Sequence, residues 1–391
     1  MLLQIKVYLV GILYFFGVLF MILFPPRNYS ISGAKTRTVR STSNNLTFTT
    51  FVTPNTLPNI MNRLASNNKE VAQVIHLKPN TAGNRTIMAL ELRSDRQTVK
   101  PGILIVGELN AMAWSVPNAI IELAEKLIYD PSYQTPFFND YDWYLIPMAN
   151  PDGLHYAQSL RDLQPLDTSV WSRNATVRKF TRPMEWIKNI EIVDEKDEMC
   201  FGININRNFA YHWHDDVRIT PNICSQLYPG DKPFSSAEAQ AIRSYIDGLG
   251  ETIHLAIHLH ASLVMKKEYI LYPWRFSTRL PSNYRTLQEI GEYAARYARL
   301  PDGRLYEVHQ SSNDGKVAGS FSDYVCGVVG VDLVFIIKPY HERFPNYTDY
   351  RFISTDTYVK KSLKAIQGLV RGWRSSTKLN TLSFFGRDVE F

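Results

Sequence analysis

The sequence contains few cysteines and lacks the short motifs that mark several large enzyme classes. Three cysteines occur among 391 residues, too few for a disulfide-dense scaffold, and no two of them form a Cys-x-x-Cys pair. Neither a glycine-rich phosphate loop nor a Gly-x-Ser-x-Gly elbow is present. Phosphoryl transfer, serine hydrolysis and thiol redox chemistry therefore have no support in the sequence.

Concentrated charge is also missing. The formal net charge is +6, and the lysines and arginines are scattered along the chain. Nucleic-acid-binding proteins gather such residues into a patch or stripe, so we expect no nucleic-acid partner. With 45% hydrophobic and 20% charged residues, the composition is that of a globular chain. Its length accommodates one large domain and a short appendage.

One long hydrophobic run lies near the N-terminus. Residues 7–24 carry no charge, and as a helix they would be about 27 Å long, close to the hydrocarbon thickness of a bilayer. We therefore expect residues 1–24 to be a signal anchor that holds a single-pass protein in the membrane. A cleaved signal peptide, which would make the protein secreted, is the alternative, and a buried core helix is the third interpretation. The flanking charges do not favour an orientation with the N-terminus inside, because more cations follow the run than precede it.

Five Asn-x-Ser/Thr sequons predict that the folded part lies in the secretory lumen or outside the cell. Their asparagines are Asn28, Asn45, Asn84, Asn174 and Asn346. The cysteines agree with this compartment, because Cys200 and Cys224 bracket a short segment, as one local disulfide would. Buried reduced thiols are the alternative for all three cysteines.

The chain is organised simply after the hydrophobic run. Residues 25–47 are rich in Ser, Thr, Asn and Arg and predict a flexible, glycosylated stalk, residues 48–375 predict a folded domain, and residues 376–391 a tail. Within the domain, helix 235–249 is expected to begin with serine caps, with Glu238 three residues after Ser235. Strands are predicted over 87–92, 102–109, 143–151, 253–261 and 330–339, and helices over 116–128, 235–249 and 357–373. Continuous apolar strands that alternate with helices indicate a mixed α/β sheet covered on both faces.

Several motifs in this domain follow one another in a particular order. They are NPDG at 150–153, NINRNF at 204–209, IHLHAS at 257–262, YILYPW at 269–274 and SFSDY at 320–324. In order and spacing they resemble the M14 zinc carboxypeptidases over nearly all of residues 48–375. The resemblance implies an α/β/α sandwich around a mixed, mostly parallel eight-stranded sheet, with the active site at the carboxyl ends of the strands. It also includes the paired cysteines that flank INRNF.

The metal site of that family is largely missing from this sequence. Its members bind zinc through a His-x-x-Glu pair and a second, distant histidine. The resemblance places these ligands at Asn110, Ala113 and His258, so only His258 is retained, and none of the nine histidines has a glutamate three residues later. The general base falls at Ile336, and the mobile tyrosine falls near Gly315. We therefore expect no catalytic residues, no metal ligands and no cofactor.

The family's substrate-binding positions are better preserved. Asn206 and Arg207 stand where the family grips the terminal carboxylate of a peptide, which a guanidinium fork binds with two parallel hydrogen bonds. Arg173 falls near the arginine that polarises the scissile carbonyl, and Ser322 falls where side-chain preference is set. An ordinary ion pair is the alternative for Arg207. Hydrogen bonds that hold the loop are the alternative for the asparagines.

Two further histidine groups need an interpretation. Glu108, His258 and His260 could form a relocated metal site, since alternate residues of an extended strand share one face. The simpler interpretation of His260 is a satisfied polar residue at the cleft. His212 and His214 are interpreted as solvated residues of a loop.

Three functions compete on this evidence. The first is an inactive carboxypeptidase-like ectodomain that binds a peptide or protein, through a C-terminal carboxylate at Arg207. The second is an active metallocarboxypeptidase with an atypical site, which would require zinc. The third is a surface glycoprotein that uses faces other than the cleft.

Overall fold

The computed structural model describes residues 51–162, 186–193, 200–213, 215, 222–261, 267–340 and 355–385. The predicted anchor and stalk, with Asn28 and Asn45, lie outside these ranges, and so do Arg173, Asn174 and Asn346. None of the helices within the described ranges is long and apolar enough to span a bilayer.

An eight-stranded sheet organises the described residues, with the strand order β1-β2-β4-β3-β5-β8-β6-β7. Four neighbouring pairs of strands are parallel and three are antiparallel. This arrangement confirms the predicted mixed sheet. The strands are β1 (Ala72–His76), β2 (Met88–Leu92), β3 (Gly102–Gly107), β4 (Asp142–Ile146), β5 (Ile253–Leu259), β6 (Tyr269–Tyr272), β7 (Glu307–Gln310) and β8 (Leu333–Lys338).

The central strand β3 is buried on both faces of the sheet. Ile103 and Ile105 face one hydrophobic core, whereas Leu104 and Val106 face the other, because successive side chains of a strand point to opposite faces. A strand covered on both faces has no solvated side. This explains why the sequence shows a continuous apolar run here and no alternation.

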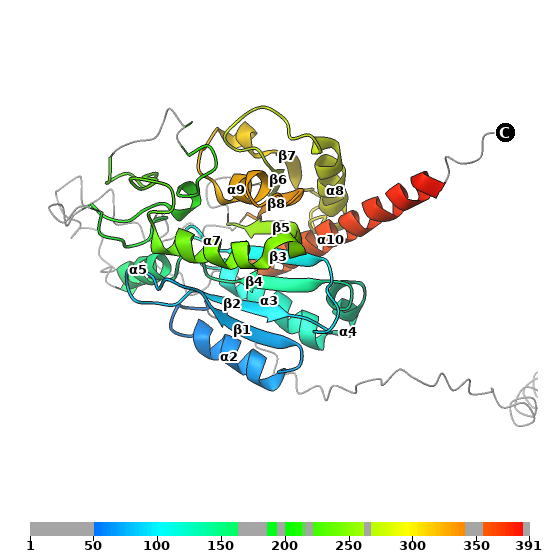
Figure 1. Ribbon diagram of the computed structural model, residues 1–391, viewed down its shortest axis with the longest axis horizontal. Coiled ribbons are helices and arrows are strands. Elements are labelled where there is room, and N and C mark those ends of the chain that lie inside the picture. The colour runs from blue at the N-terminus through cyan, green and yellow to red at the C-terminus, as the bar shows by residue number, and fades with distance from the viewer. Residues whose placement is uncertain are drawn as a thin grey trace, which may run out of the picture. The chain divides into compact units, whose positions relative to one another are not determined.

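Helices cover both faces of the sheet. Residues of α2, α3, α8 and α10 belong to the core on one face, and residues of α7 and α9 belong to the core on the other. Figure 1 shows α7 lying across the strands on the viewer's side and α10 continuing beyond them. The helices are α2 (Leu57–Asn67), α3 (Val116–Tyr129), α4 (Pro131–Tyr133), α5 (Pro151–Asp162), α7 (Ala237–Leu249), α8 (Tyr284–Tyr297), α9 (Phe321–Gly327) and α10 (Thr355–Phe385), with short turns η1 (Gln134–Phe138), η4 (Ile205–Arg207), η5 (Gly250–Thr252) and η6 (Ser311–Asp314). The expected α/β/α arrangement is confirmed.

Helix α10 is longer than the sequence pattern predicts. The apolar periodicity ends at Trp373, but the helix continues to Phe385. No proline or glycine occurs between these two residues, so nothing in the sequence interrupts the backbone hydrogen bonds. The strands β1, β6 and β7 and the helices α2, α4, α5, α8 and α9 are absent from the predicted elements.

The first turn of α7 also differs from the prediction. Ser236, not Ser235, is the cap, and its hydroxyl accepts a hydrogen bond from the Ala239 N–H at 3.1 Å. Ser235 is used elsewhere, since its Oγ accepts from Asn208 Nδ2 at 2.9 Å. The side chain of Glu238 is fully buried and accepts from Asn189 Nδ2 at 2.7 Å. A serine therefore caps the helix as predicted, but the expected pairing of Ser235 with Glu238 in the first turn is wrong.

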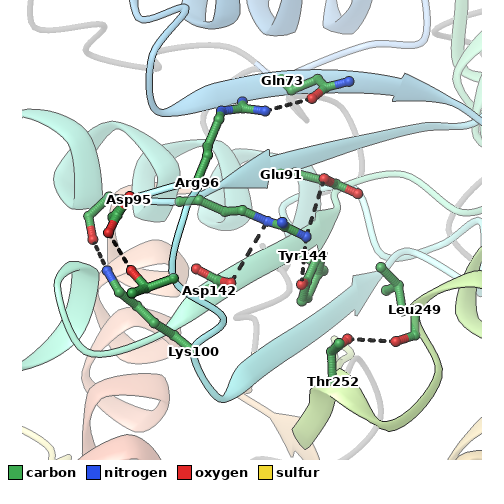
Figure 2. A network of polar contacts seen from close by, with 12 residues as sticks. Gln73, Glu91, Asp95, Arg96, Lys100, Asp142, Tyr144, Leu249 and Thr252 are labelled. Carbon is green, nitrogen blue, oxygen red and sulfur yellow. Dashed lines mark hydrogen bonds and ion pairs between the residues drawn. The ribbon is translucent and has the colours of Figure 1, made fainter.

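A polar network holds the sheet together at the amino end of β4 (Figure 2). Arg93 donates to the Tyr144 hydroxyl at 3.0 Å, and its Nε lies 3.8 Å from the carboxylate of Asp142. Tyr245 of α7 donates to Glu91 of β2 at 3.1 Å. The network thus joins β2, β4 and α7 at the edge of the sheet opposite the carboxyl ends of β3 and β4.

Candidate functional site

The carboxyl ends of β3, β5 and β8 meet at one edge of the sheet. The three strands run parallel, with Val106 paired to His258 and His258 paired to Ile336. The turn that follows β3 carries Asn110 and Ala113, so it leaves the sheet at the same edge. The structure thereby brings together the positions that the resemblance assigns to zinc and to the general base.

Asn110 and Ala113 lie in a tight turn between β3 and α3. The Ala113 N–H donates to the Asn110 carbonyl at 3.0 Å, and the Ala113 methyl is buried in the hydrophobic core. Asn110 is 6% exposed, and its Oδ1 has no hydrogen-bond partner among the described residues. A methyl group cannot ligate a metal, and an amide oxygen is a poor ligand for zinc.

His258 is the one retained ligand position. It is buried, and its Nε2 has no hydrogen-bond partner within the described part of the chain. Burial lowers the pKa of its imidazole well below the usual value, and the nearby His260 and Lys338 lower it further. The ring is therefore neutral at physiological pH, which is the form that binds metals.

The positions of the base and the mobile tyrosine carry no reactive group. Ile336 is 4% exposed and packs with Tyr269 and Leu271 in a small apolar cluster, and its hydrocarbon cannot accept a proton. Gly315 follows η6 with a φ of +101°. Such a backbone conformation favours glycine, so a tyrosine in its place would be strained.

These residues do not fit a hydrolytic zinc centre. Such a centre needs three protein ligands and an open position for water, whereas Asn110, Ala113 and His258 supply one imidazole and one amide. The described ranges also contain no group of three or more His, Cys, Asp or Glu residues able to hold a metal ion together.

The relocated metal site is not formed by the described residues either. The strand β3 ends at Gly107, and Glu108 has a φ of +55°, so Glu108 is not part of an extended strand. Its Oε2 accepts from the Asn150 N–H at 3.2 Å, and its carboxyl group interacts with that of Glu238. The premise of the relocated site, that Glu108 lies on an extended strand, is therefore wrong.

The Asn-Arg-Asn turn is held in place by its two asparagines. Asn206 Oδ1 accepts from the N–H of Phe321, the first residue of α9, at 3.1 Å. Asn208 Nδ2 donates to Pro229 O at 2.7 Å, and Asn208 Oδ1 accepts from the Ser236 N–H at 2.9 Å. Both side chains thus bond to the backbone of other segments. Arg207 lies between them and is half-buried.

Asp323 connects α9 to the segment after β6, and Ser322 precedes it in the same helix. Ser322 is buried, and its hydroxyl lies 3.2 Å from the hydroxyl of Ser320. The Asp323 carboxylate accepts from the N–H of Arg275 at 2.9 Å and from the N–H of Phe276 at 3.0 Å. Burial raises the pKa of Asp323 to about 6, although these backbone donors oppose the increase.

The structure adds charged residues that the sequence did not single out. Lys338 is the last residue of β8, and its Nζ lies 3.3 Å from Asp314 Oδ2, while Asp314 Oδ1 lies 3.2 Å from His309 Nε2. Burial, assisted by the charge of Arg275, lowers the pKa of Lys338 to about 8. One signal in the sequence could have pointed to Lys338 as a site residue. It stands two residues after Ile336, and residues two apart on a strand share a face.

The remaining predicted residues are the cysteines, Asn84 and His212. Cys200 and Cys224 form a disulfide, as expected, and burial raises the pKa of the free Cys326 thiol to about 12. Asn84 is exposed, as a glycosylation acceptor must be. His212 is exposed, stacks on Phe276 and pairs with Asp215.

Comparison with known proteins places these observations in a family. A family model described as zinc carboxypeptidase, peptidase M14, matches residues 57–362. The chain is 26% identical over 281 residues to carboxypeptidase B of Astacus astacus, covering 71% of this chain and 82% of that protein. It is also 26% identical over 281 residues to zinc carboxypeptidase A 1 of Drosophila melanogaster, covering 69% of this chain and 56% of that protein.

One group of relatives is named as inactive. A protein of Saccharomyces cerevisiae named as an inactive metallocarboxypeptidase is 26% identical over 264 residues, covering 63% of this chain and 54% of its own. The present chain thus spans little more than half of the Drosophila and yeast relatives. Among solved structures, carboxypeptidase A from Helicoverpa armigera has a TM-score of 0.69 at 21% identity, covering 84% of this chain and 74% of that one. The structural similarity establishes the fold.

Proposed function

Because the chain belongs to the zinc carboxypeptidase family, we propose that it is an inactive member that binds the C-terminus of a peptide or protein without cutting it. The observation that carries this proposal is the apolar environment of Ile336, which packs with Tyr269 and Leu271 at the position of the general base. A hydrolytic site must deprotonate a metal-bound water there.

The turn around Arg207 supports binding. Asn206 fastens the turn to α9, and Asn208 fastens it to the start of α7, so Arg207, which is half-buried, is carried by a well-supported segment. Positioned guanidinium groups bind carboxylates through two parallel charge-assisted hydrogen bonds. The support of this turn does not depend on a metal.

The polar atoms at the former metal positions suit an intact peptide bond. Asn110 Oδ1 is an acceptor and the neutral His258 ring has one donor nitrogen, and both Oδ1 and Nε2 are unpartnered within the described residues. Leaving such buried atoms unsatisfied is unfavourable. A bound peptide, or ordered water in its absence, would satisfy them.

The names of the relatives support two different functions. The Astacus and Drosophila proteins are named as carboxypeptidases, which favours the alternative that this chain is an active zinc enzyme with an atypical site. The yeast relative is named as inactive, which favours binding alone. The few ligand atoms that Asn110 and His258 offer favour binding alone over an active zinc enzyme.

Calorimetry on the purified full-length chain tests the proposal. A peptide with a free C-terminal carboxylate should bind, and the same peptide with a C-terminal amide should bind about tenfold more weakly or worse. Arg207→Ala should remove this difference, whereas Arg207→Lys should retain part of it. Stoichiometric zinc together with release of C-terminal residues would overturn the proposal in favour of the enzyme. Equal binding of the acid and the amide would favour a glycoprotein that uses other faces.

We further propose that the domain is displayed on the lumenal or extracellular side, anchored through residues 7–24 or secreted after cleavage. The disulfide between Cys200 and Cys224 supports an oxidising compartment, and the exposed Asn84 supports glycosylation. Glycosidase-sensitive mobility of the expressed protein, with carbonate extraction of membranes, tests both parts. A protein without glycans in the soluble cytosolic fraction would contradict them.

A further inference from the structure

The outer edge of β1 pairs with no other described strand. β1 begins the strand order of the sheet, and β2 is its one neighbour there. In Figure 1 it lies at the margin of the sheet, next to α2. The opposite margin is partly covered, because Gln288 of α8 donates to the Val308 carbonyl of β7 at 3.4 Å. Natural proteins usually cover or disrupt a strand edge, so that of β1 needs an explanation.

The register of β1 and β2 determines which backbone groups point away from the sheet. Residue pairs of an antiparallel ladder alternate between pairs that exchange backbone hydrogen bonds and pairs that do not. The Leu77 N–H donates to the Ile87 carbonyl at 2.9 Å, in register with the ladder, so the odd-numbered residues of β1 bond to β2. The N–H and C=O groups of Ala72, Val74 and His76 therefore point outward.

These outward groups are available to another strand. The Ala72 N–H donates to the Asn68 carbonyl at 2.9 Å, but the backbone groups of Val74 and His76 have no hydrogen-bond partner among the described residues. An unpaired row of N–H and C=O groups pairs readily with an extended chain. Because backbone groups are alike in every chain, the side chains have to identify the partner.

The side chains of β1 fit a second copy of the same strand. An antiparallel pairing with its two-fold axis at Val74 would place Gln73 opposite Ile75 of the second copy. Residues 72–76 contain no Lys, Arg, Asp or Glu, so no like charges would face each other. Val74 and Ile75 are half-buried against the hydrophobic cores of the two sheet faces, and the pairing would cover them further.

The charges that flank β1 are complementary in the same register. Glu70 stands four residues before Val74, and Lys78 stands four residues after it. Each would therefore lie opposite the other in the second copy, and both are exposed. Opposite charges that face each other across an antiparallel pair stabilise it, whereas like charges destabilise it. A parallel pairing would instead bring Glu70 beside Glu70 of the second copy.

We propose that two copies of this chain associate through the outer edges of β1, as antiparallel strands that join two eight-stranded sheets into one. The backbone groups of Val74 and His76 supply the hydrogen bonds, and Glu70 with Lys78 sets the register. A five-residue strand buries little surface, so the dimer is weak and depends on concentration. The association does not rest on the proposed function, and it presents two copies of the candidate site together.

Disulfide cross-linking of the purified full-length chain in detergent tests the pairing. In a hydrogen-bonded pair the Cα atoms lie about 5.5 Å apart, within reach of a disulfide, so Val74→Cys should cross-link to itself on oxidation. Val99→Cys, at a residue that is 85% exposed, is the control and should give at least about tenfold less dimer, because only association raises the effective concentration of the thiols. Equal cross-linking of the two variants would overturn the proposal.

A mixture of two variants tests the register. Gln73→Cys and Ile75→Cys should form a mixed dimer when they are oxidised together, since these positions face each other across the axis. Either variant oxidised alone should form little dimer, because its thiols would lie two residues out of register. A mixed dimer no more abundant than the dimers of the single variants would contradict the antiparallel register.

Sedimentation velocity over a series of concentrations measures the association itself. Glu70→Lys and Lys78→Glu should each dimerise about tenfold more weakly than the natural chain, because two attractive pairs become repulsive. Mixing these two variants restores opposite charges at both pairs and should restore the association. An association that neither substitution weakens would overturn the proposed pairing.

Val74→Pro tests the role of the backbone. It removes an N–H group that the ladder with β2 does not use, and proline is tolerated at such a position of an edge strand. The dimer should therefore be lost while the melting temperature changes little. A dimer that survives Val74→Pro would overturn the proposal, because the contact would then lie elsewhere. A chain that stays monomeric but binds extended peptides at β1 would overturn it as well.

Discussion

His258 and Ile336 are paired in register on the neighbouring parallel strands β5 and β8. An imidazole suited to hold a metal thus lies next to a branched hydrocarbon at the position of the base. Ile336 packs against Tyr269 and Leu271, so the isoleucine is part of a small core of its own. A carboxylate at this position would disturb that packing.

We predict that zinc does not stabilise the natural chain but does stabilise a variant with the missing ligands. Asn110→His combined with Ala113→Glu would recreate the His-x-x-Glu pair beside His258. Because ligand binding to the native state raises stability, micromolar zinc should raise the Tm of the variant. The Ala113→Glu change enlarges a residue that is 1% exposed, so the metal-free variant should melt below the natural chain. Differential scanning fluorimetry measures both effects, and a zinc-dependent increase in the natural chain would contradict the prediction.

We predict that Ile336→Glu destabilises the fold. The substitution places a carboxyl group in the apolar cluster of Tyr269 and Leu271, where burial disfavours the ionised form. The loss should be about 3 to 5 kcal/mol at pH 7. Ile336→Val is the matched control and should lose only about 1 kcal/mol. Urea denaturation measures both. Equal stability of the Glu and Val variants would show that this position is not apolar in solution.

We predict that stability falls as the pH rises from about 4.5 to about 8 because of Glu238. Burial raises the pKa of its carboxyl from 4.5 to about 8 in the folded chain. Between these values the unfolded chain releases the proton while the folded chain keeps it, so each pH unit removes up to about 1.4 kcal/mol of unfolding free energy. Glu238→Gln should flatten this dependence. Glu251→Gln, at an exposed glutamate, should leave it unchanged.

The buried carboxyl of Glu108 should contribute in the same direction. Burial raises its pKa well above the usual value, and the proximity of Glu238 adds to the increase. Denaturation of the Glu238→Gln variant from pH 5 to pH 9 should therefore leave a smaller slope of the same sign. An unchanged slope in that variant would mean that Glu238 is not protonated in the folded chain.

We predict that substitutions of Asn206 and Asn208 affect stability and peptide binding to different extents. Asn208→Ala removes four hydrogen bonds, to Pro229, Lys232, Ser235 and Ser236, and should lower stability by about 3 kcal/mol. Asn206→Ala removes one described hydrogen bond, to Phe321, and should lower it by about 1 kcal/mol. Peptide binding should nevertheless weaken more in the Asn206 variant, when both are measured well below their melting temperatures. The reverse order of affinities would argue against a ligand at this turn.

Much of the fold follows from local patterns in the sequence. The strands β3, β5 and β8 are continuous apolar runs, and α3 has an apolar stripe with Pro117 near its first turn. Burial on both faces of a sheet produces such runs directly. The short edge strands β1 and β7 are less apolar and partly exposed, so their sequences give little periodic contrast. Which serine caps α7 depends on a tertiary contact. Asn208, from a distant segment, donates a hydrogen bond to Ser235, and Ser236 is the cap.

The sequence by itself determines which chemistry is missing at the site. The residue types at positions 110, 113 and 336 are an amide, a methyl and a hydrocarbon wherever they lie. The methyl and the hydrocarbon can neither ligate zinc nor accept a proton, and the amide is a poor zinc ligand. Only the tertiary structure decided which charges meet there. Lys338, Arg275 and Asp314 come from a strand end and two loops with no common period. They become neighbours because β8 pairs with β6 and the loops are joined by backbone hydrogen bonds.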